Sequence, residues 1–269
     1  MVDTAVVGKR YYFVANLRAD MSPKAAREYM QKFVLHGKDN SLFRDLGTYK
    51  SEVVMGAPAK CLAAVREKLG PVDDVVKLAV QNLRIAKAAP AGSASLDQAT
   101  AARAEYVIIG HPFVRKELQE FAELDQAINQ SVKESLARKI TPILCVGETA
   151  AEKITGLEMN TVSAQLSSGL AGLSAEKVKR VMIAYLPGWA VKTGEAAKPA
   201  EAQRVHAGIA RILTKLAHAG QNEVPIIYGG SLTEQNVEAL VSQKDVWGGF
   251  VGRASMEAER FLELILSGF

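Results

Sequence analysis

Short β-branched, apolar runs alternate with longer alanine-rich stretches along this whole chain, and this alternation limits the fold most. Eight runs predict buried strands, at residues 11–16, 52–57, 76–82, 106–111, 142–147, 181–186, 225–230 and 249–252. Between them, apolar residues recur with helical spacing at residues 24–35, 59–69, 124–138, 161–173, 200–217 and 234–242. Strands that alternate with helices pair in parallel through right-handed crossovers, so the pattern predicts an α/β protein.

Eight strand–helix units within 269 residues favour a closed (β/α)8 barrel that forms a single domain over residues 1–269. An open sheet that binds a dinucleotide would have a glycine-rich loop after its first strand. The corresponding segment, residues 16–20, contains no glycine. We therefore expect the barrel.

Two helix starts are marked by local signals. Ser22 offers a side-chain cap and Pro23 suits the first helical position. Thr233 and Glu234 predict the start of a later helix.

Composition excludes several classes of protein. The net charge is only +4 with Lys and Arg scattered among acids, and no apolar stretch approaches a membrane span, so we expect neither nucleic acid nor membrane as a partner. Cys61 and Cys145 have no metal-site spacing, and the first eight residues lack a signal-peptide pattern. These features predict a cytoplasmic protein without a metal or cofactor.

Six short motifs of glycines and polar residues lie at the predicted strand ends, which form the active site in barrels of this kind. They are Asn16-Leu17-Arg18, Gly110-His111, Cys145-Val146-Gly147-Glu148, Ala184-Tyr185-Leu186-Pro187-Gly188-Trp189, Tyr228-Gly229-Gly230-Ser231 and Val251-Gly252-Arg253. Over nearly the whole chain they resemble triosephosphate isomerase, whose fold is the TIM barrel. The resemblance implies an isomerase of glycolysis that acts on a small sugar phosphate.

The resemblance also implies roles for individual residues. Asn16 matches the family's residue at that position, and Arg18 replaces a lysine. His111 corresponds to a neutral histidine that polarises the substrate carbonyl, and triosephosphate isomerase is a standard example of this chemistry. Leu186 occupies the position of the glutamate that acts as general base. The phosphate-binding positions correspond to Lys192, Gly229, Gly230, Ser231, Gly252 and Arg253.

Several positions depart from the family pattern. Phe113 replaces the glutamate that would orient the cation at Arg18, and Pro112 removes a backbone N–H beside His111. Lys192 and Arg253 stand where the family has glycines. We therefore expect a remodelled anion site, or a surface that an anion no longer constrains. Glu148 is expected to contact Trp189 rather than to replace the missing base.

Three functions remain open from the sequence. The first is an inactive or strongly impaired paralogue, a pseudoenzyme, kept for binding or assembly. The second is an active sugar-phosphate isomerase with a relocated base or an altered substrate, and the third, an ordinary isomerase, requires a different alignment around Leu186. A carboxylate near the pocket of His111 and Asn16 would favour the second. A homodimer is expected from the family, although the loop at residues 83–95 lacks the family's Thr-Gly-Glu tip.

Overall fold

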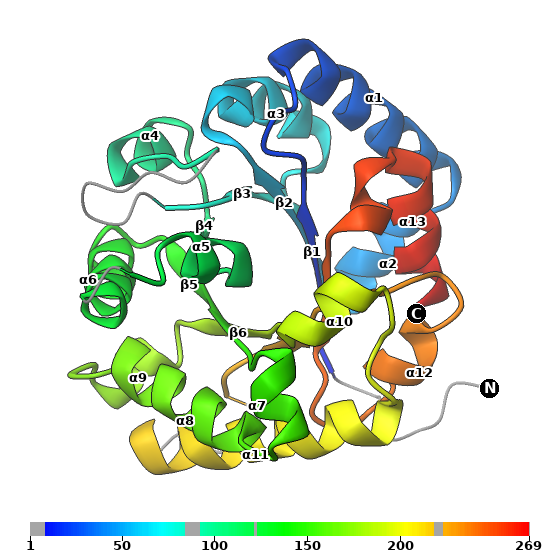
Figure 1. Cartoon of the computed structure of the whole chain (residues 1–269). Helices are drawn as coiled ribbons and strands as arrows, with labels where there is room; N and C mark the ends of the chain where they lie inside the picture. The colour runs from blue at the N-terminus through cyan, green and yellow to red at the C-terminus, as the bar shows by residue number, and fades with distance from the viewer. Residues whose placement is uncertain (1–8, 84–91, 121–122, 218–222, 269) are drawn as a thin grey trace.

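The eight predicted strands close into one barrel. The computed structural model describes residues 9–83, 92–120, 123–217 and 223–268. Its parallel strands follow one another in chain order, and β1 pairs with both β2 and β8 (Figure 1). They are β1 (Tyr12–Asn16), β2 (Glu52–Ala57), β3 (Val76–Val80), β4 (Tyr106–Ile109), β5 (Thr141–Val146), β6 (Met182–Tyr185), β7 (Ile226–Tyr228) and β8 (Gly248–Val251).

Helices surround this barrel on the outside (Figure 1). They are α1 (Pro23–Asp39), α2 (Leu42–Thr48), α3 (Leu62–Leu69), α4 (Leu96–Ala101), α5 (Pro112–Glu117), α6 (Leu124–Ala137), α7 (Ala150–Ile154), α8 (Glu158–Gly169), α9 (Ala175–Val178), α10 (Gly188–Thr193), α11 (Pro199–Ala217), α12 (Val237–Val241) and α13 (Ala258–Ser267), with 3-10 turns η2 (Ala59–Cys61), η3 (Gly70–Val72) and η4 (Arg253–Met256). None of the helices in the described residues is long and apolar enough to cross a membrane.

Two buried layers hold the fold together, because strands in a parallel sheet are covered on both faces. Alternate strand residues such as Phe13 and Tyr185 pack outward against the helices. Their neighbours, including Val14, Cys145 and Leu186, fill the barrel interior. The sheet is therefore a packed core, and a ligand has space only at its ends.

The two helix starts predicted from local signals have different outcomes. The predicted cap is confirmed, because the Ser22 hydroxyl accepts the N–H of Ala25 at 3.2 Å. The predicted start near Thr233 is wrong, since α12 begins at Val237. Residues 234–236 form a turn there, in which the Thr233 carbonyl accepts the N–H groups of Asn236 and Val237 and the Asn236 side chain accepts the Thr233 N–H at 2.9 Å. In the loop at residues 83–95, residues 84–91 lie outside the described part, so the dimer stays a prediction.

Candidate active site

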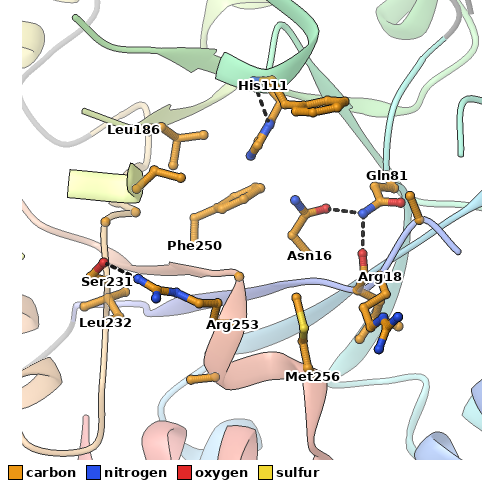
Figure 2. Close-up of a pocket in the computed structure, with 18 of the residues that line it drawn as sticks. Asn16, Arg18, Gln81, His111, Leu186, Ser231, Leu232, Phe250, Arg253 and Met256 are labelled. Carbon is orange, nitrogen blue, oxygen red and sulfur yellow. Dashed lines mark hydrogen bonds between the residues drawn. The ribbon is translucent and has the colours of Figure 1, made fainter. Parts of the chain in front are cut away.

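A cavity of about 740 Å³ opens at the carboxyl ends of the strands. It brings together residues that are far apart in the sequence, because parallel strands all end at the same rim (Figure 2). Nine of the ten residues proposed for the site line it, namely Asn16, Arg18, His111, Leu186, Gly229, Gly230, Ser231, Gly252 and Arg253. The tenth, Lys192, belongs to α10, and its side chain lies outside what the structure describes.

His111 caps the start of α5 and faces the cavity. Its Nδ1 accepts the backbone N–H of Phe113 at 3.3 Å, and burial lowers the pKa of His111 to about 4. The neutral ring thus carries its proton on Nε2, the nitrogen that points into the cavity in Figure 2. Pro112 has no backbone N–H to donate to the His111 ring. The next N–H along the chain, that of Phe113, donates to the ring, so the start of α5 still holds His111.

Leu186 directly follows β6 and is almost completely buried, with 1% of its surface exposed. Its N–H donates to the Val146 carbonyl at 2.7 Å, which ties the backbone to the neighbouring strand. A Cβ added at Gly229 would lie 2.2 Å from Leu186 Cδ2, so this glycine leaves the space that the leucine fills. The position therefore offers only hydrocarbon to a ligand.

Asn16 and Arg18 at the end of β1 have different surroundings. The Gln81 amide donates to Asn16 Oδ1 at 2.9 Å and also to the Leu17 carbonyl, which fixes Asn16 at the rim. Arg18 instead points to solvent and binds both oxygens of Asp20, at 2.9 and 2.6 Å. Sequence reasoning missed Gln81, although a polar Gln-Asn pair directly after the apolar strand β3 was an available signal.

Carboxylates near this cavity are few. Among the described residues that line it, Asp20 is the only one, and Arg18 holds it at the exposed edge. Glu148 lies buried beside the cavity, where its Oε1 accepts the indole N–H of Trp189 at 2.8 Å and the hydroxyl of Tyr185 at 3.1 Å. It therefore pins α10 to the end of β5.

Ser231, Gly230 and Arg253 line another part of the cavity. Ser231 adopts a left-handed φ of 49°, donates its hydroxyl to the Ala190 carbonyl at 2.8 Å and accepts Arg253 Nη2 at 3.2 Å. A Cβ at Gly230 would lie 2.6 Å from the Tyr228 hydroxyl, so only glycine fits there. Arg253 opens η4 and extends beside Gly194, whose φ is 84°.

Two other observations concern Cys145 and the side chains that could bind a metal ion. Cys145 is fully buried in the barrel interior, and burial raises the pKa of its thiol to about 12, so it stays protonated and packs as an apolar group. Within residues 9–83, 92–120, 123–217 and 223–268, no cluster of His, Cys, Asp and Glu is arranged to hold a metal ion.

Known proteins are similar to this chain in sequence. A family model described as triosephosphate isomerase matches residues 12–267. This chain belongs to the triosephosphate isomerase family. Triosephosphate isomerase of Endomicrobium trichonymphae is 40% identical over 191 residues, 71% of this chain and 75% of that relative. Triosephosphate isomerase of Chloroherpeton thalassium is 38% identical over 218 residues, 80% of this chain and 84% of that relative.

The family assignment confirms the resemblance inferred from the strand-end motifs and the TIM barrel inferred from the alternation. It gives the cavity a chemical context, because the family acts on a phosphorylated three-carbon sugar.

Proposed function

We propose that this protein is a triosephosphate isomerase family member that binds a phosphorylated small molecule without isomerising it, or isomerises it only very slowly. One observation carries the proposal: the position of the general base is occupied by Leu186, which has no lone pair to accept a proton. Aldose–ketose isomerisation begins with removal of a proton from carbon, and loss of a general base alone costs roughly 10²- to 10⁴-fold in rate.

The rest of the site supports binding. The neutral imidazole of His111 can still donate from Nε2 to an oxygen of a ligand, and the side chain of Asn16 is held at the same rim. Arg253 and Ser231 offer a cation and a hydroxyl to a phosphate group. These groups recognise and orient an anion, but they do not remove a proton from carbon.

A relocated base is the alternative that the sequence left open. Asp20 is engaged by both donors of Arg18 at the exposed edge, and the Glu148 oxygen that has partners is bound to Trp189 and Tyr185. Asp20 is held at the exposed edge of the cavity, and Glu148 is not among the described residues that line it. The geometry of the described residues therefore supports a family member without isomerase activity over one with a relocated base.

A coupled dehydrogenase assay with glyceraldehyde 3-phosphate tests this function. We expect no turnover above background for the purified protein, with the triosephosphate isomerase of Chloroherpeton thalassium assayed in parallel as an active control. The His111→Gln variant, purified in the same way, identifies a contaminating host enzyme, whose activity would be the same in both preparations. Turnover by the wild type that disappears in this variant would refute the proposal.

A homodimer and a cytoplasmic location complete the proposal, and they rest on the family alone. Light scattering on the purified chain tests the dimer. A monomer at micromolar concentration would show that the altered loop at residues 83–95 no longer supports assembly.

A further inference from the structure

The cavity has an apolar floor, formed by Leu186, Phe250 and the ring of His111. Leu186 and Phe250 both lie beside Gly229, where an added Cβ would come within 2.2 Å of one and 2.9 Å of the other. The rings of Phe250 and His111 are 5.8 Å apart between centroids and 32° from parallel. In Figure 2, Phe250 lies between His111 and Arg253, at the centre of the hollow. A ligand that reaches the bottom of the cavity therefore meets hydrocarbon and aromatic surface.

Apolar side chains also stand at the mouth of the cavity. Phe113, Val191 and Met256 line it and keep 56%, 44% and 41% of their surface exposed. Such exposure is unfavourable unless something covers these groups, and a gathered apolar patch usually marks a binding surface. A triose phosphate, in which every carbon bears an oxygen as carbonyl, hydroxyl or phosphate ester, has little apolar surface to place against them.

Positive charge in the cavity is concentrated at one place. Three arginines line it, and two of them are already paired: Arg18 with Asp20 at 2.6 Å, and Arg260 with Glu234 at 2.8 Å. Arg253 has no carboxylate partner among the described residues, and its one observed side-chain bond goes to the Ser231 hydroxyl. Its remaining N–H groups are available to an anion.

From this arrangement we propose that the site takes a phosphate monoester with an aromatic or branched aliphatic body rather than a sugar phosphate, with the phosphate on Arg253 and Ser231 and the body on the apolar floor. This inference rests on the proposed function, because it names the ligand class of the same cavity. The volume of about 740 Å³ is in the range of sites that enclose molecules much larger than a triose.

Titration calorimetry on the full chain with three probes tests the ligand class. We expect phenyl phosphate to bind at least about tenfold more tightly than glycerol 3-phosphate or inorganic phosphate, because only its ring buries apolar area on the floor. Equal affinity for phenyl phosphate and glycerol 3-phosphate, or a preference for the latter, would overturn the inference. So would the absence of binding by all three at millimolar concentration.

Variants separate the two halves of the site. Met256→Ala should weaken phenyl phosphate several-fold and leave inorganic phosphate unchanged, whereas Arg253→Ala should weaken all three probes by a similar factor. Ile154→Ala is the matched control, because this exposed residue on α7 does not line the cavity. A loss of phenyl phosphate binding in the control equal to that in Met256→Ala would contradict the assignment.

The outcomes distinguish this inference from the proposed function. Isomerase turnover by the wild type refutes the proposed function whatever the probes show. If the protein is inactive and binds glycerol 3-phosphate as tightly as phenyl phosphate, the proposed function stands and the inference of an aromatic ligand is refuted.

Discussion

Tyr185 and Leu186 are neighbours at the end of β6, yet they belong to regions of opposite character. Tyr185 is part of a polar group, here called the lid anchor, that comprises Glu148, Tyr185, Trp189 and Tyr228. In it, Glu148 accepts hydrogen bonds from Trp189 and Tyr185, and the Tyr228 hydroxyl accepts the Ala197 N–H at 2.8 Å. Leu186 points the other way, into the apolar floor of the cavity.

This difference follows from the alternation of side chains along a strand. The lid anchor faces the helices, and its hydrogen bonds join groups of the chain to one another, so they stabilise the folded protein whatever the cavity holds. The apolar floor faces the ligand, and its side chains contribute to chemistry only through what binds there. The hydrogen bonds of the lid anchor are therefore complete although residue 186 is a leucine.

The prediction with the largest expected effect asks whether restoring a base at position 186 is enough for catalysis when the rest of the site is unchanged. Leu186→Glu by itself should recover little activity, because Arg18 remains paired with Asp20 and the anion rim is altered. Rates should rise by roughly 10²-fold or more when the other departures are reversed as well, since a misplaced substrate costs about that factor and grouped residues act together. The added changes are Arg18→Lys, Phe113→Glu, Lys192→Gly and Arg253→Gly.

The same coupled assay decides the outcome by kcat/KM of both variants. Full activity in Leu186→Glu alone would mean that the rim is not remodelled in any way that matters. A matched control is Leu186→Gln, which adds a polar group of similar size without a base and should stay inactive.

Stability should separate the two regions next. Glu148→Ala leaves the half-buried Trp189 indole N–H and the buried Tyr185 hydroxyl without their acceptor, so it should cost about 3 kcal/mol of unfolding free energy. Phe113→Ser, at an exposed position on the cavity side, should change it by less than about 0.5 kcal/mol. Urea unfolding followed by tryptophan fluorescence measures both, and similar costs would contradict the comparison.

The pH dependence of stability tests the burial of His111. Because its folded pKa is lowered to about 4, below the usual 6.5, the unfolded chain binds the proton more readily. Stability is therefore full above about pH 6.5 and falls as pH drops toward 4, by at most about 3 kcal/mol from this group. In His111→Gln that part of the fall should be missing, while at pH 8 the difference between the two proteins gives the baseline. Parallel curves for the two proteins between pH 6.5 and 4 would be the contrary result.

The smallest effect concerns the lid segment, residues 187–197. Tyr228→Phe removes the acceptor of the Ala197 N–H and should cost about 1 kcal/mol. Hydrogen exchange at Ala197 should become faster, while exchange within β7 stays nearly unchanged. Unaltered exchange at Ala197 would show that this bond does not hold the segment.

Strand positions could be predicted closely because each strand is a short apolar run that is buried on both faces. The run predicted at residues 52–57 is β2 without change, and the others differ by one to three residues at their ends. The sequence places the start of α12 too early, because the turn at residues 234–236 begins with the same signals and the same Thr233 carbonyl acceptor as the first turn of a helix. The polar pair after β3 marks Gln81 as a candidate for the rim, but its bond to Asn16 is decided only when β1 and β3 reach the same rim.

The sequence by itself determined the barrel, the residues at the ends of most of its strands and the aliphatic side chain at position 186, because these depend on side-chain type and on periodic burial. Only the tertiary structure decided which partners the charged groups have. Asp20 is bound by Arg18, and Glu148 is bound by Trp189 and Tyr185. Arg253 retains free donors in the cavity. A carboxylate or a guanidinium acts through distance and burial, and both are properties of neighbours that the fold brings together from distant parts of the chain.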